Sequence, residues 1–150
     1  MILTNLTQSE QKHKILNGVK IIEGSEGFSF GNCACKAISE AFNMNAGTCV
    51  FACKLLDLDY IDGLTFKECN FLISKLASIS YRKVYYKANK EKMSLIDFCK
   101  KNKQGTFILN TPEHLSLLRD GVIVDTYYFQ NPWIINKLLG FWEIKPLFHY

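Results

Sequence analysis

The spacing of apolar residues divides the chain into a helical first part and a strand-rich last part. Small and apolar side chains recur every three or four residues from Ala34 to Phe42, which predicts a closely packed helix beginning near residue 33. After Gly105 the apolar period changes to two, which is typical of strands. This order predicts an α+β fold, with N-terminal helices, the first of them central, packed on a C-terminal antiparallel sheet.

Local signals place the other elements. Thr65 and Glu68 form a capping box, and Ser94 is a good helix N-cap. Residues 1–16 are polar, with a weak periodicity compatible with a helix. Further helices are expected over residues 47–56, 65–77 and 94–101, and strands over residues 18–22, 83–86, 106–109, 114–118, 122–126 and 140–144.

Length and composition indicate one folded domain over residues 1–150, of which residues 1–17 could be an N-terminal extension. Hydrophobic residues make up 48% of the chain, which argues against disorder. The net charge of +4 is scattered, so no nucleic-acid partner is expected. No apolar run approaches the ~20 residues that span a bilayer, and the N-terminus does not resemble a signal peptide. We therefore expect a cytoplasmic protein without a membrane partner.

Cysteine is the first residue type in the chain that could carry out chemistry. In a reducing cytosol the six cysteines should be thiols, most of them buried. Cys33 differs because it follows Asn32, a good N-cap, and so falls in the first turn of the expected helix. The partial positive charge of a helix N-terminus favours a thiolate there, and free backbone amides could hold an oxyanion.

A thiolate nucleophile needs a base, and His114 is the best placed of three histidines. It begins an expected strand that turns at Asp120-Gly121, a two-residue hairpin signal. With that loop Arg119 pairs with Val122, and Asp125 lies diagonal to His114 on the same face. Asp125 could then orient the imidazole and complete a triad, whereas a three-residue loop would move it to the opposite face.

Several segments, in the same order, resemble a group of small phage proteins with papain-like architecture, and more distantly C39-type bacteriocin-processing peptidases. The resemblance runs from about Gly31 to Ile144 and is most specific in the C-terminal half. It implies a papain-like fold and a Cys33, His114, Asp125 triad. The matching segments are Asn32-Cys33-Ala34-Cys35-Lys36-Ala37-Ile38, Gln104-Gly105-Thr106-Phe107-Ile108-Leu109, His114-Leu115, Asp120-Gly121, Val124-Asp125-Thr126 and Gly140-Phe141-Trp142-Glu143-Ile144.

Two positions depart from the family pattern. Asn32 stands where the family usually has aspartate, a change that keeps a good N-cap. Papain-like enzymes place an oxyanion-donating glutamine about six residues before the cysteine, and here that region is Glu26-Gly27-Phe28. Asn32 or backbone amides would have to take over this role.

Other interpretations compete at each residue. Cys33 could be a buried structural thiol, His114 a strand histidine with ordinary partners, and Asp125 a hairpin-end residue. Cys35 is a weaker nucleophile candidate. Zinc binding by Cys33, Cys35, Cys49 and Cys53 is disfavoured by their spacing, and a calcium loop at residues 57–63 by its misplaced glycine. The aromatic stretch of residues 127–133 is expected to pack as a loop, and could wall a substrate groove.

The function expected from these residues is that of a papain-like cysteine peptidase or related thiol hydrolase acting on a peptide or protein, without a cofactor or metal. The resemblance implies a phage origin, and a place in the host cytoplasm or the virion. The alternative is a catalytically silent scaffold of the same fold, serving as a virion component or as a binder that inhibits a host factor.

Overall fold

Five helices and seven strands make up the described part of the chain. The computed structural model describes residues 13–24, 33–59, 64–132 and 137–146. In chain order the elements are β1 (His13–Leu16), β2 (Val19–Ile22), α1 (Cys33–Ala41), α2 (Ala46–Leu55), α3 (Phe66–Ile79), β3 (Arg82–Ala88), α4 (Leu95–Lys101), β4 (Thr106–Thr111), β5 (His114–Arg119), β6 (Val122–Val124), α5 (Thr126–Gln130) and β7 (Gly140–Pro146).

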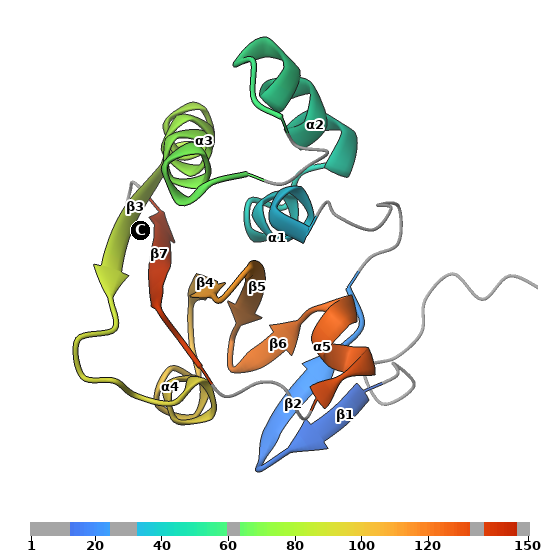
Figure 1. The fold of residues 1–150 in the computed structure, drawn as a ribbon, viewed down its shortest axis with the longest axis vertical. Coiled ribbons are helices and arrows are strands. Elements are labelled where there is room, and N and C mark those ends of the chain that lie inside the picture. Colours follow the sequence, from blue (N-terminus) through green and yellow to red (C-terminus); the bar gives the residue numbers. More distant parts are fainter. Residues whose placement is uncertain (1–12, 25–32, 60–63, 133–136, 147–150) are drawn as a thin grey trace, which may run out of the picture.

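All seven strands belong to one sheet, in the order β1-β2-β6-β5-β4-β7-β3. Neighbouring strands are antiparallel except β2 and β6, which run parallel. The α+β class is therefore confirmed, but the sheet is mixed rather than purely antiparallel. The parallel pair brings the N-terminal hairpin of β1 and β2 beside the C-terminal strands (Figure 1).

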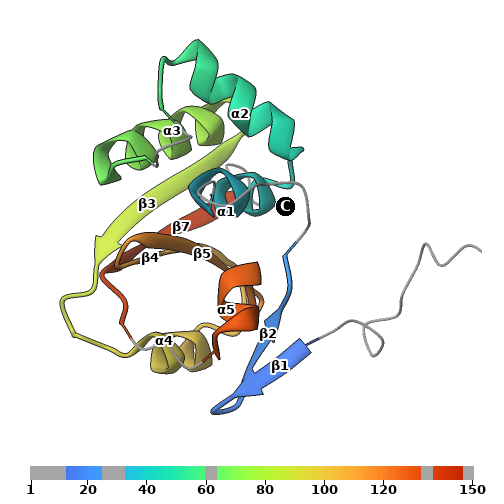
Figure 2. The ribbon, with the colours of Figure 1, turned by 45° about the vertical axis from the view of Figure 1, so that its right-hand side comes forward.

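Helices cover both faces of this sheet. Helices α1, α2 and α3 lie on one side, and α4 lies on the other (Figure 2). On the first side Leu115 and Leu117 of β5 join a core with Trp142 and the helices, and on the second Leu118 joins a core with α4. The central strands are consequently apolar on both faces, which is why their sequence shows nearly continuous hydrophobic runs.

Helices α1, α3 and α4 begin where the sequence signals predict. Thr65 and Glu68 form the expected capping box, with bonds of 2.9 and 3.2 Å, and the Ser94 hydroxyl accepts from the Asp97 amide at 3.1 Å. The side chain of Asn45 caps α2. Helix α1 begins at Cys33, as expected, and buries its small apolar face against β5.

Three expectations about elements were wrong. His13–Leu16 is a strand rather than part of a helix, because it pairs with β2. The strand expected over residues 122–126 ends at Val124, and Thr126–Gln130 form helix α5 rather than a loop. Asp125 changes the direction of the chain here, because its carboxylate caps the new helix.

No helix in the ranges described above combines the length and the apolar content needed to cross a membrane.

Candidate functional site

The hairpin of β5 and β6 has the predicted register. Arg119 pairs with Val122 and Leu117 with Val124, so the loop is the two residues Asp120 and Gly121. Both have positive φ angles, of 50° and 80°, as a type I′ turn requires. This register sets His114 and Asp125 on the same face, although the ladder itself ends at Val124.

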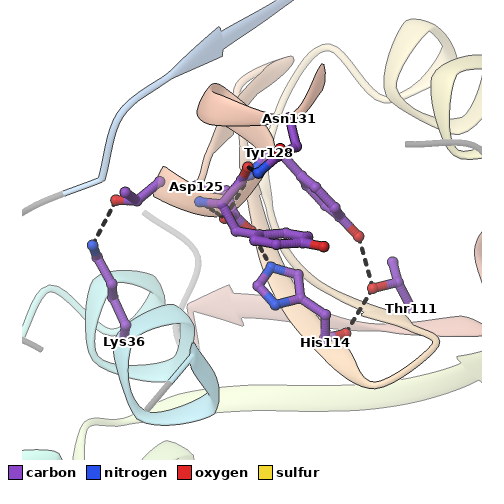
Figure 3. A network of polar contacts seen from close by, with 8 residues as sticks. Lys36, Thr111, His114, Asp125, Tyr128 and Asn131 are labelled. Atoms are coloured by element: carbon purple, nitrogen blue, oxygen red, sulfur yellow. Dashed lines mark hydrogen bonds and ion pairs between the residues drawn. The ribbon is translucent and has the colours of Figure 1, made fainter. Parts of the chain in front are cut away.

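His114 and Asp125 are in direct contact (Figure 3). The imidazole Nε2 lies 2.6 Å from Oδ2 of the carboxylate, where an N–H group donates to the oxygen. The side chains are 13% and 6% exposed, so the pair is nearly buried but the imidazole still reaches solvent. The other ring nitrogen, Nδ1, takes no part in this bond.

Asp125 is fixed by backbone amides as well. Its Oδ1 accepts hydrogen bonds from the amides of Tyr127 at 2.8 Å and Tyr128 at 3.2 Å, at the start of α5. Its own amide donates to the carbonyl of Ile22 in β2 at 3.0 Å. The carboxylate therefore cannot rotate away from His114 without breaking the cap of α5.

A chain of hydroxyl groups holds His114 from the other side. The Tyr128 hydroxyl donates to Thr111 Oγ1 at 2.8 Å, and the Thr111 hydroxyl donates to the carbonyl of His114 at 2.7 Å (Figure 3). The rings of Tyr127 and Tyr128 lie 5.1 and 4.9 Å from the imidazole, centroid to centroid. The aromatic stretch after Asp125 thus packs directly against the candidate base.

Two side-chain contacts define the direction of α1. The guanidinium group of Arg119, at the end of β5, donates to the carbonyl of Glu40 near the C-terminus of α1. Lys36 Nζ, one turn from the helix start, donates to Oγ1 of Thr126, which follows Asp125. Helix α1 consequently runs along β5 in the same direction, and its N-terminal end lies at the His114 end of the sheet.

Cys33 is the first residue of α1, so its backbone is at the end of the helix nearest the His114–Asp125 pair. Its side chain and the whole of Asn32 lie outside the described residues. The expected N-cap and the oxyanion role of Asn32 therefore stay predictions.

Side chains of β5 alternate between the two faces of the sheet, and His114 and helix α1 lie on different faces. Leu115 and Leu117 face the core beneath α1, so strand alternation directs His114 to the other face. The imidazole lies against Tyr127 and Tyr128. Because His114 is the first residue of β5, any contact with a group on α1 would pass around the end of that strand.

Sequence reasoning missed Lys36, Thr111 and Tyr128 as site residues. Thr111 could have been found, since it pairs with His114 across the short β4–β5 turn. Lys36 bonds to Thr126, 90 residues away in the sequence, and Tyr128 bonds to Thr111, 17 residues away. Such contacts depend on how the helices pack, and no local sequence pattern indicates them.

A separate cluster concerns metal binding. Of the four cysteines considered for zinc, Cys35, Cys49 and Cys53 meet in the core between α1 and α2, with all three sulfur atoms within 4.8 Å of one another. None of the five cysteines with described side chains is in a disulfide.

No protein-family model, no curated protein and no solved structure matches this chain.

Proposed function

We propose that the chain adopts a papain-like fold and is a cysteine peptidase or a related thiol hydrolase. The observation that carries the proposal is the 2.6 Å bond between His114 and Asp125, at the end of the sheet where α1 begins with Cys33. A nearly buried, carboxylate-oriented imidazole is what a thiol nucleophile needs as its base. The substrate would be a peptide or protein, in the host cytoplasm if the chain is phage-encoded.

The proposed steps use only groups of this chain and water. His114 takes the thiol proton of Cys33 on Nδ1, while its Nε2–H group keeps donating to Asp125. The thiolate attacks the substrate carbonyl carbon, and the imidazolium then protonates the leaving group as the thioester forms. Water, deprotonated by the same imidazole, hydrolyses the thioester and restores the thiol. Free amides at the start of α1 would stabilise the oxyanion.

The catalytically silent scaffold is the second candidate, and one observation favours it. Asp125 already has a structural role, because it accepts two amide hydrogen bonds at the start of α5. A carboxylate in that position would be useful to the fold without any catalysis. The two candidates differ in whether His114 activates Cys33.

The rate of Cys33 alkylation by iodoacetamide, followed by peptide mass spectrometry as a function of pH, separates them. Cys35, Cys49, Cys53, Cys69 and Cys99 are buried, at 0–3% exposure, and serve as slow internal references. In the wild-type protein we expect Cys33 to be alkylated rapidly at pH values well below ~8.5, the pKa of an ordinary cysteine. His114→Ala should move the labelling curve back toward that value.

His13→Ala is the matched control, since His13 lies on the exposed edge strand β1. It should leave the labelling curve in place. If wild-type Cys33 titrates like an ordinary cysteine and His114→Ala changes nothing, the hydrolase proposal fails and the silent scaffold replaces it. Cys33→Ala should also abolish turnover of a peptide library by the purified protein.

A further inference from the structure

Three thiols converge in the core between the first two helices. Cys35 comes from α1, and Cys49 and Cys53 come from α2, where they are four residues apart and so share a helix face. The sulfur atoms of Cys35 and Cys53 are 3.6 Å apart, and all three lie within 4.8 Å of one another. Their residues are 0–1% exposed.

These separations suit a shared metal ion. Three sulfur ligands at about 2.3 Å from one ion lie about 4.0 Å apart in a trigonal planar site. The sulfur atoms of Cys35 and Cys53 are 3.6 Å apart, and no pair in the cluster is separated by more than 4.8 Å. The cluster is therefore close to a coordinating geometry.

The number and type of ligands decide which ion fits. Among the residues with described side chains, no histidine, carboxylate or further cysteine joins the three sulfur atoms. Structural zinc is almost always four-coordinate, whereas soft thiolates also select Cu(I). A site of three sulfur ligands, one short of the four that structural zinc takes, therefore favours the soft Cu(I) ion.

We propose that Cys35, Cys49 and Cys53 form a binding site for Cu(I). Each thiol that becomes a ligand releases one proton to solvent, and neither copper nor sulfur changes oxidation state. The ion would join α1 to α2, which lies at the edge of the molecule beside α1 (Figure 1).

The test is an anaerobic titration of the reduced, full-length protein with Cu(I) held by a chromogenic chelator, followed until absorbance is constant. Wild type should withdraw one copper ion per chain, and X-ray absorption should give a shell of three sulfur neighbours. Because proton release accompanies binding, copper uptake should increase with pH.

Single substitutions Cys35→Ser, Cys49→Ser and Cys53→Ser should each abolish the one-to-one endpoint. Cys99→Ser is the matched control, because Cys99 is equally buried but lies in the core on the other side of the sheet, and it should keep the endpoint. Circular dichroism identifies any variant that has not folded, and Cys→Ala variants at the same positions then replace it. The proposal is overturned if wild type leaves copper with the chelator, or if folded cluster variants bind as wild type does.

Discussion

At the scale of single residues, Asp125 has two tasks, one for each carboxylate oxygen. Oδ2 holds the imidazole of His114, and Oδ1 accepts from the amides that begin α5. The two tasks depend on different properties. Capping needs only an acceptor oxygen, whereas orienting a basic imidazole needs an acceptor that faces Nε2.

Substitution of Asp125 should separate these tasks. Asp125→Asn can keep an oxygen on the α5 amides, so the free energy of unfolding should fall little. Its NH₂ group would then face Nε2 and favour the imidazole tautomer with the proton on Nδ1, which cannot accept the Cys33 proton. Asp125→Ala removes both contacts and should lower the free energy of unfolding by about 1–2 kcal/mol.

Urea unfolding and Cys33 alkylation near pH 6 measure the two effects. We expect both variants to lose rapid alkylation, and only Asp125→Ala to lose substantial stability. Equal stability loss in the two variants, or unchanged alkylation in Asp125→Asn, would show that the carboxylate does not act on His114 as proposed.

At the scale of elements, the sequence predicted those whose signals are local. Capping residues at Thr65 and Ser94, and the Asp120-Gly121 turn, each act within four residues and were found where expected. Strand β1 and helix α5 were missed because their state depends on distant partners. β1 is exposed yet pairs with β2, and α5 begins where Asp125 leaves the ladder and caps the new helix.

Helix α4 gives a prediction about pH. Burial raises the pKa of the Cys99 thiol from 9.0 to about 12. Above pH 9 the unfolded chain loses this proton and the folded chain keeps it, so stability should fall as pH rises from 9 toward 12, by up to about 1.4 kcal/mol per pH unit. Below pH 9 both states hold the proton and this group has no effect.

Cys99→Ser removes the titrating thiol at nearly the same volume. Urea unfolding of both proteins under reducing conditions, between about pH 8 and pH 10.5, should give a shallower decline for the variant. The comparison uses the slope of the free energy of unfolding against pH, because lost packing lowers the free energy of unfolding of the variant at every pH. The raised pKa of Cys53 lowers stability with pH in the same way in both proteins, so its effect cancels in the comparison. Parallel stability profiles would therefore contradict the raised pKa of Cys99.

At the scale of the whole molecule, the sheet brings the parts of the site together. The β5–β6 hairpin carries His114 and Asp125, the parallel pair of β2 and β6 ties it to the N-terminal strands, and Arg119 and Lys36 align α1 with it. The sequence predicted the His114–Asp125 contact because one short turn determines it. It could not predict the path of α1 or the meeting of three cysteines, which depend on tertiary packing.

The backbone conformation of the turn residue Gly121 should therefore affect the geometry of the His114–Asp125 pair. Its φ of 80° is a conformation that asparagine adopts readily and that β-branched residues adopt poorly. A Cβ atom at this position would lie 3.3 Å from Lys103 Cα in any variant, so Gly121→Asn and Gly121→Val share that contact and differ chiefly in backbone strain.

We expect Gly121→Val to be less stable than Gly121→Asn by about 1–2 kcal/mol in urea unfolding. If valine relaxes the turn into a three-residue loop, the register shifts by one residue and Asp125 moves to the opposite face from His114. Folded Gly121→Val should then lose rapid Cys33 alkylation near pH 6, while Gly121→Asn keeps it. Equal stability and equal alkylation in the two variants would mean that the type I′ turn does not set the geometry of the His114–Asp125 pair.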